Sequence, residues 1–260
     1  MKIQQKLLVL FLIIAIISGC DLATNSEEIM ETEDSPLSSV LPIISNPENF
    51  KDKPFRVTYY QGTNLIYIKD KYYNSDGNEA LDVYYKSSNL DTAGITIYTY
   101  QNNLPVEKNS YPLVDGEYIA SEKFTYLYDD QKRLLKTLRT DATLYMRYEY
   151  NQENQIDKIL FSENTSNVEG YQFYYDETGN ISRQVWSSFY PEDSPIRDWH
   201  YIYDNEGKLK YKSIPTYPDG ELNPMFVYLY DDQGRQIEEQ ELYPEYGFVL
   251  HFRKTYEYPE

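Results

Sequence analysis

The sequence predicts an all-β protein, built as an antiparallel meander of repeated β-hairpins that forms a curved or spiralling open sheet. Three observations support this prediction. A short motif, Tyr-x-Tyr followed by Asp or Asn, recurs about every 22 to 28 residues, as expected for one supersecondary unit copied many times. Tyrosine makes up 30 of the 260 residues, and its apolar ring with a polar tip suits a half-wet pleated surface. Few windows lack β-branched and aromatic residues over the roughly ten positions that a helix needs.

The first residues are expected to be removed rather than folded. Lys2 and Lys6 precede an unbroken apolar run over residues 7–17. This run is shorter than the roughly twenty residues that span a bilayer, and it fits a secretory signal. The next residues, Ser-Gly-Cys20, resemble the lipobox of bacterial lipoproteins. That resemblance implies that residues 1–19 are a signal peptide and that Cys20 is lipidated and becomes the mature N-terminus. An ordinary signal peptide or an uncleaved anchor is the alternative.

Composition restricts both the chemistry and the partners of the mature chain. Cys20 is the only cysteine, so disulfides and thiolate metal sites are excluded. Loss of the two lysines in the signal leaves 22 basic against 42 acidic residues, a net charge of −20. Such a surface disfavours nucleic acid and anionic lipid headgroups. We therefore expect no nucleic-acid partner. We expect attachment through acyl chains to the outer face of a bacterial membrane, either the cell membrane or the outer membrane.

The remaining chain divides into a tether and a domain. Residues 20–50 are acidic and polar without a basic residue, which predicts a lipidated N-terminus followed by a disordered tether. Val40 begins the one apolar patch in this segment, which could dock on the domain or cap its first strand. Strand-like runs and turn signals alternate afterwards, so the β domain is expected over residues 51–260.

Turn chemistry explains the motif. In Asp204-Asn-Glu-Gly207 the Asp is first and the Gly fourth, as a type I turn prefers. The carboxylate can accept from the N–H two residues on, and Gly tolerates the left-handed conformation that closes the hairpin. In the strand that follows, Lys208, Lys210 and Lys212 are expected to face solvent while Tyr211 faces inward. The structural turn residues predicted in this way are Asp129, Asn151, Asp176, Gly179, Asp204, Gly207, Asp231 and Gly234.

These residues also carry a family likeness. Tyr201–Lys208 and Tyr228–Arg235 resemble the YD repeat, also called the Rhs repeat, in which Tyr-Asp, two variable residues, Gly and a basic residue precede Leu. Leu209 stands at the Leu position, and Gln236 departs from it. In large members of that family the repeats spiral into a hollow shell around a toxin. The likeness covers roughly residues 98–258, with five full units, which we expect to be too few to close a shell. It therefore implies a hairpin-repeat sheet without encapsulated cargo.

No catalytic site, metal site or cofactor is expected. His200 and His251 lie in different repeats, each on the expected solvated face of a strand, and neither accompanies a nucleophile. The Asp129-Asp130 and Asp231-Asp232 pairs recur at equivalent turns, which indicates turn capping. Weak calcium binding at these acidic turns is the alternative.

The candidate ligand contacts are aromatic and cluster around two adjacent repeats: Trp186, Phe189, Tyr190, Trp199 and Tyr201. Exposed rings bind sugars or partner proteins; alternatively, they fill space between sheet faces. We expect a membrane-anchored, non-enzymatic lipoprotein that acts as a binding or scaffold module for an envelope protein or glycan. Two alternatives stay open. One is an enzyme acting on cell-envelope polysaccharide through two carboxyls about 5 to 9 Å apart in a cleft. The other is an accessory or immunity partner of an Rhs-type toxin.

Overall fold

The computed structural model describes residues 35–45, 49–140, 145–161, 169–188, 194–215, 220–243 and 249–259. The predicted signal peptide and Cys20 lie outside these residues. A short 3-10 helix, η1 (Leu41–Ile43), is followed by eighteen strands. Among the described residues, no helix is long and apolar enough to cross a membrane. The strands are β1 (Ile44–Ser45), β2 (Arg56–Gln61), β3 (Asn64–Asn74), β4 (Glu79–Lys86), β5 (Thr92–Gln101), β6 (Leu104–Val114), β7 (Glu117–Tyr118), β8 (Glu122–Tyr128), β9 (Leu134–Arg139), β10 (Tyr145–Tyr150), β11 (Ile156–Leu160), β12 (Glu169–Tyr175), β13 (Ile181–Ser188), β14 (Ser194–Tyr203), β15 (Leu209–Pro215), β16 (Leu222–Tyr230), β17 (Gln236–Tyr243) and β18 (Val249–Glu257).

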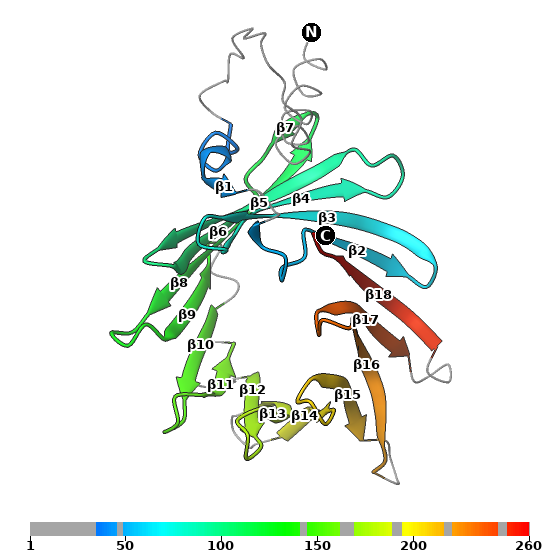
Figure 1. Cartoon of the computed structure of the whole chain (residues 1–260). Helices are drawn as coiled ribbons and strands as arrows, with labels where there is room; N and C mark the ends of the chain where they lie inside the picture. The colour runs from blue at the N-terminus through cyan, green and yellow to red at the C-terminus, as the bar shows by residue number, and fades with distance from the viewer. Residues whose placement is uncertain are drawn as a thin grey trace, which may run out of the picture.

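Sixteen of these strands form one closed antiparallel barrel (Figure 1). Strands β2–β6 and β8–β18 pair in chain order, and β18 closes the ring on β2, from Phe252 opposite Gln61 to Glu257 opposite Arg56. The predicted open, spiralling sheet is therefore wrong. Strands β2–β5, most of which lie upstream of the motif copies, supply further complete hairpins, which raises the number of units enough for closure. A closed barrel also leaves no unpaired edge.

The second Tyr of the motif joins each hairpin to the preceding one. The Tyr203 hydroxyl donates to the carbonyl of Ile181, and that of Tyr230 to Leu209, both at 2.9 Å. Eight such bonds follow one end of the barrel, from Tyr73, Tyr100, Tyr128, Tyr150, Tyr175, Tyr203, Tyr230 and Tyr258. At seven of these tyrosines, all except Tyr258, a bulge shifts the ladder register. The motif is thus a joint between repeats as well as a turn signal.

The turn acceptors lie directly after these tyrosines. Asp204 Oδ1 accepts from the N–H groups of Glu206 and Lys208, both at 2.9 Å. The side-chain oxygens of Asp129, Asn151, Asp176 and Asp231 accept in the same way. Gly179, Gly207 and Gly234 have φ of 86°, 80° and 79°, the region that glycine adopts without strain.

The outer wall is covered at one place by residues that the sequence assigned to the tether. Residues 35–45 pack against β3–β5, where Leu37 and Val40 join a buried cluster with Leu81 and Ile95. In Figure 1 this segment, with η1 and β1, lies outside the ring. Part of the expected tether therefore belongs to the fold, and the apolar residues of β3–β5 point outward.

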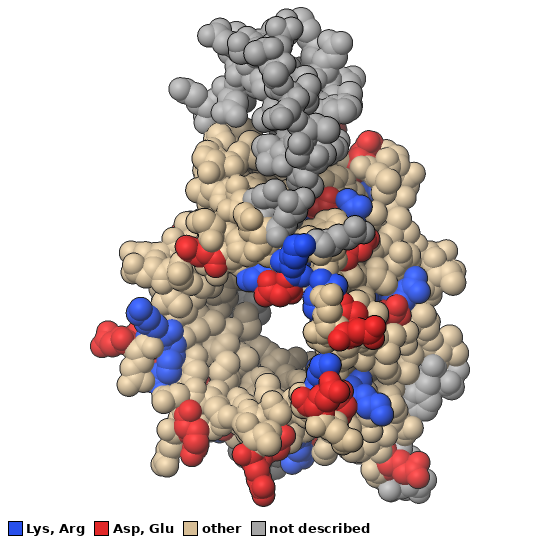
Figure 2. Space-filling model, viewed as in Figure 1, with Lys and Arg blue, Asp and Glu red and all other residues tan. Residues whose placement is uncertain are grey.

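The inner wall is the wet, aromatic face. Directly paired residues of neighbouring strands lie on the same face of a sheet. Starting from the outward-facing cluster, the strand pairing therefore tells for each strand which residues face outward and which face the lumen. Figure 2 shows an opening through the ring, as expected because barrels of about sixteen strands leave an aqueous channel. Lys212 pairs with Tyr201 and Phe226 on the inner wall, whereas Tyr211 pairs with Val227 on the outer wall. At Lys212 and Tyr211 the predicted alternation is present with the two faces exchanged, and a bulge between Ile202 and Tyr203 interrupts the alternation before Leu209.

Candidate functional site

Three of the five predicted ligand-contact aromatics lie on the inner wall. Trp186 pairs with Tyr171, and Tyr201 pairs with Lys212, while Trp199 lies two residues before Tyr201 on β14. All three predicted residues are half-buried. Phe189 and Tyr190 lie outside the described residues. Because the chain has only two tryptophans, every tryptophan of this protein is on the inner wall.

Lys212 lies at the centre of an aromatic cluster, which we call the Lys212 cluster: Trp199, Tyr201, Lys212 and Phe226. The Lys212 Nζ is 4.8 Å from the ring centroid of Tyr201, 5.1 Å from that of Trp199 and 5.5 Å from that of Phe226. These are cation–π distances. Burial lowers the pKa of Lys212. Three strands, β14–β16, therefore hold one partly desolvated cation among three rings.

One ring of the cluster is held by a hydrogen bond, and further rings lie beside the cluster. The Tyr201 hydroxyl donates to Gln184 Oε1 at 2.5 Å. The Trp186 ring lies 6.4 Å from that of Tyr171, and its Nε1 is buried with no hydrogen-bond partner among the described residues. The aromatic wall thus extends from the Lys212 cluster to β12 and β13.

On the other side of the Lys212 cluster the charges are paired. Glu239 accepts from Lys254 Nζ at 3.0 Å and from the Tyr256 hydroxyl at 3.2 Å. The Tyr59 and Tyr67 rings stack at 4.1 Å and continue the row across the closure of the barrel. Glu239 is therefore already committed to partners of its own.

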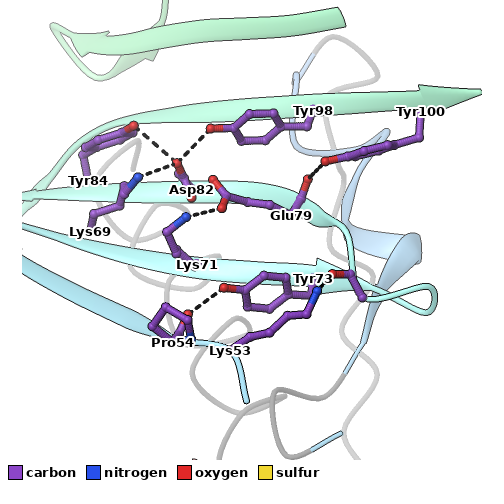
Figure 3. Close-up of polar contacts among 11 residues, drawn as sticks. Lys53, Pro54, Lys69, Lys71, Tyr73, Glu79, Asp82, Tyr84, Tyr98 and Tyr100 are labelled. Carbon is purple, nitrogen blue, oxygen red and sulfur yellow. Dashed lines mark hydrogen bonds and ion pairs between the residues drawn. The ribbon is translucent and has the colours of Figure 1, made fainter. Parts of the chain in front are cut away.

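A second cluster, the Asp82 cluster, lies on the inner wall of β3–β5 (Figure 3). Asp82 is fully buried. Its Oδ2 accepts from Lys69 Nζ at 3.1 Å, from the Tyr98 hydroxyl at 3.2 Å and from the Tyr84 hydroxyl at 3.4 Å. Its Oδ1 has no hydrogen-bond partner among the described residues.

The neighbouring carboxylate sets the protonation of Asp82. Burial, and then the charge of Glu79, raise the pKa of Asp82 to about 6. Burial alone would raise the pKa of Glu79, but the Lys71 ammonium, which forms an ion pair with it, lowers that pKa. As pH falls, Asp82 is therefore protonated before Glu79.

The Asp82 cluster was not predicted from the sequence. The signal was present as Lys69-x-Lys71 before the Asn74 turn and Glu79-x-x-Asp82 after it, opposite charges on facing strands. Its members have defined partners, and its central carboxylate is closed off from the lumen. Such an arrangement is suited to holding the wall together and not to meeting a ligand.

The remaining candidates do not form a site. His200 lies on the outer wall with Nε2 3.3 Å from Asp198 Oδ1, and the His251 ring packs on Phe252. Across the described ranges, no group of three or more His, Cys, Asp or Glu could hold a metal ion. The acidic turn residues accept from the main-chain N–H groups two residues further along the same turn.

No protein-family model matches the chain, and a comparison with curated proteins gave no match. Crystal structures of porin-like proteins from Bacteroides uniformis and Bacteroides vulgatus resemble it at TM-scores of 0.36 and 0.38, with 10% and 15% identity. These alignments cover 79% and 80% of this chain and 98% of each of those chains. Two crystal structures of TcdB2–TccC3, one with Cdc42 and one with TEV, align with 71% of this chain at 13% and 12% identity and TM-scores of 0.27 and 0.26. This chain spans 12% of their length. Likenesses at this level identify neither a family nor a function.

Proposed function

We propose that this protein is a lipid-anchored, non-enzymatic binding protein of the bacterial envelope, and that the inner wall of its barrel binds an extended glycan strand. The observation that carries this proposal is the row of half-buried rings around the opening. Aromatic faces stack on the apolar faces of sugar rings, and an opening at both ends admits a polymer (Figure 2). Both tryptophans, Trp186 and Trp199, lie in this row.

The outer wall supports a position in water rather than within lipid. A barrel that spans a membrane has an outward apolar band about 25 Å tall. Here ion pairs occupy the outward face of the strands, with N···O distances of 2.6 to 2.8 Å: Lys123–Glu107, Arg147–Glu149 and Arg183–Asp198. Attachment through acyl chains on Cys20 then fits a barrel that stands beside a membrane. Substitution of Cys20 by Ser should release the protein from the membrane fraction, and continued sedimentation with membranes would contradict the anchor.

The absence of catalysis is also part of the proposal. The two acids of the Asp82 cluster are already in ion pairs, Glu79 with Lys71 and Asp82 with Lys69. Asp82 is also fully buried and cannot contact a ligand. A glycosidase pair must reach both sides of a glycosidic bond. We therefore assign the pair to stability, and the protein to binding without turnover.

Tryptophan fluorescence tests the proposal directly, because both fluorophores lie on the inner wall. We expect titration of the full chain with chitohexaose, a neutral hexamer of N-acetylglucosamine, to shift tryptophan emission, and calorimetry to give a matching Kd. Replacement of Trp199 by Ala should weaken binding at least about tenfold, since stacking of one ring contributes roughly 1 to 3 kcal/mol in comparable polymer sites.

The matched control is Tyr174→Ala, because Tyr174 is an aromatic residue of the outer wall that is 43% exposed. It should bind chitohexaose like the unaltered chain. Near-ultraviolet circular dichroism checks that both variants fold, and Phe226→Leu is a second, milder inner-wall change. Equal loss in Tyr174→Ala would move the site to the outer wall. If neither chitohexaose nor soluble peptidoglycan strands bind, the inner wall is not a glycan site, and a protein partner becomes the next test.

A further inference from the structure

Lys212, on β15, differs from the inner-wall lysines of β3 and β18. Lys69, Lys71 and Lys254 each form an ion pair on the inner wall, with Asp82, Glu79 and Glu239 respectively. Lys212 contacts three aromatic rings and forms no hydrogen bond or ion pair with a described residue. Its nearest acid in electrostatic terms, Glu239, is held by Lys254. No acid in the described part of the chain therefore pairs with this ammonium.

A desolvated cation without an anion is unfavourable, and cation–π contacts offset only part of that cost. The rings contribute faces but no negative charge. An anion that arrives with the ligand completes the environment, because a hydrogen bond between an ammonium and a carboxylate is about twice as strong as a neutral one. The partial burial that lowers the pKa of Lys212 also strengthens its attraction for such an anion.

We infer that the Lys212 cluster is a subsite for a carboxylate-bearing sugar of the bound glycan. The carboxylate accepts from Lys212 Nζ, while the Trp199 and Phe226 rings, which contact each other with centroids 5.5 Å apart, form one aromatic surface against which the sugar packs. This inference rests on the proposed function, because it assigns the class of sugar that the inner wall selects. The selectivity is local: the chain as a whole has a charge of −18, which repels polyanions at long range.

Another inner-wall lysine provides a matched control. Lys108 pairs with Tyr98 and Phe124, and its Nζ lies 5.5 Å from the Phe124 ring centroid, with no second ring in cation–π contact. It shares with Lys212 the charge, the wall and one aromatic neighbour. It lacks the three-sided cluster, so its replacement measures the general effect of removing positive charge from the lumen.

The test compares two hexasaccharides of similar length by calorimetry on the full chain. The hyaluronan hexasaccharide alternates a uronic acid with N-acetylglucosamine, and chitohexaose is neutral. We expect the uronate-containing probe to bind about tenfold more tightly, as one charge-assisted hydrogen bond gives. Lys212→Met, which keeps the length and apolar stem of the side chain, should abolish this preference, so that the two probes bind this variant with equal affinity. Lys212→Arg should retain the preference, and so should Lys108→Met.

Each failure has a separate meaning. Equal affinity of the unaltered chain for both probes overturns the subsite while the glycan site stands. A preference that survives in Lys212→Met, or that is lost equally in Lys108→Met, also overturns it, since a diffuse positive potential would then be responsible. No binding of either probe, with the near-ultraviolet spectrum unchanged, rejects the proposed function itself.

Discussion

The inner wall uses ionisable groups in two opposite ways. In the arc β3–β5, Asp82 is completely enclosed and its Oδ2 accepts from Lys69 and two tyrosine hydroxyls. In the arc β14–β16, Lys212 is half-buried among aromatic rings without a bound anion. Both arcs are made of the same hairpin unit, and both place the charge beside aromatic side chains. The difference lies in what covers the outer side of the sheet.

Behind Asp82, residues 35–45 cover the outer face with Leu37 and Val40, so the sheet has a dry side and its wall packs tightly. On the strands next to Lys212, the outer face of β13 and β14 carries the Arg183–Asp198 pair, whose side chains are 41% and 26% exposed. A charge in a tightly packed wall must be paired. A charge in a wall that is exposed to solvent can remain unpaired until a ligand binds. The first arc is thus built for stability and the second for binding.

The largest expected effect comes from breaking the paired arc. Lys69→Met removes the cation from a fully buried carboxylate and should lower the free energy of unfolding by about 3 to 5 kcal/mol. Lys212→Met removes a cation that has no such partner and should change it by less than about 1 kcal/mol. Urea denaturation at neutral pH measures both variants. Equal losses would mean that the two arcs do not differ in the way described.

The pH dependence of stability sharpens the same contrast. Because the pKa of Asp82 is raised to about 6 from its ordinary value of 3.8, the folded chain holds a proton that the unfolded chain releases. This group's contribution to stability therefore falls as pH rises from about 4 to about 6, by about 2 kcal/mol. Asp82→Asn removes that contribution. We expect the unaltered chain to lose stability relative to Asp82→Asn between pH 4 and pH 7, and parallel pH profiles would contradict the raised pKa.

Two equivalent turn glycines test the packing of the two arcs. Gly77 and Gly207 have φ of 76° and 80°. A Cβ at Gly77 would lie 3.0 Å from the Phe50 ring, whereas a Cβ at Gly207 meets nothing within 4 Å. Replacement by Ala should cost about 1 kcal/mol at Gly207, from backbone strain alone, and about 2 kcal/mol at Gly77. Thermal melts give the order, and a larger loss at Gly207 would contradict the crowding of the first arc.

The smallest effect should be the same in both arcs. The Tyr100 hydroxyl donates to the Glu79 carbonyl at 2.8 Å, and the Tyr203 hydroxyl to the Ile181 carbonyl at 2.9 Å. Each Tyr→Phe change should cost about 1 kcal/mol. Tyr174→Phe, on the exposed outer wall, should cost nothing measurable. Unequal losses at Tyr100 and Tyr203 would show that the joints between hairpins are not equivalent around the ring.

The repeated motif was sufficient to predict the all-β class and the positions of the hairpin turns, because turn chemistry depends on adjacent residues such as Asp204 and Gly207. The closure of the sheet into a barrel could not be predicted from turn chemistry. It depends on pairing between β18 and β2, and the hairpins of β2–β5 keep the turns but have lost most of the motif. A count of clear copies therefore left the barrel too small to close.

The site was predicted only in part, for a related reason. Alternation along Leu209, Lys212 and their neighbours separates two faces but does not say which one is wet. In a hollow barrel both are, so Lys212 and Tyr211 were assigned to the wrong sides. Trp186, Trp199 and Tyr201 stood out by composition. The Asp82 cluster requires the register of three strands, which no local pattern provides.

The closure of the ring also has a kinetic consequence. All eight tyrosine joints connect residues that are near in sequence, so hairpins can form and associate locally as the chain emerges. The contact between β18 and β2 joins residues about 200 positions apart, and such distant contacts form slowly. Until they do, the sheet is open and has two unpaired edge strands, which can pair with the edge strands of another chain. The barrel should therefore refold most efficiently at low protein concentration, where the last strand meets the first of its own chain before it meets a neighbour.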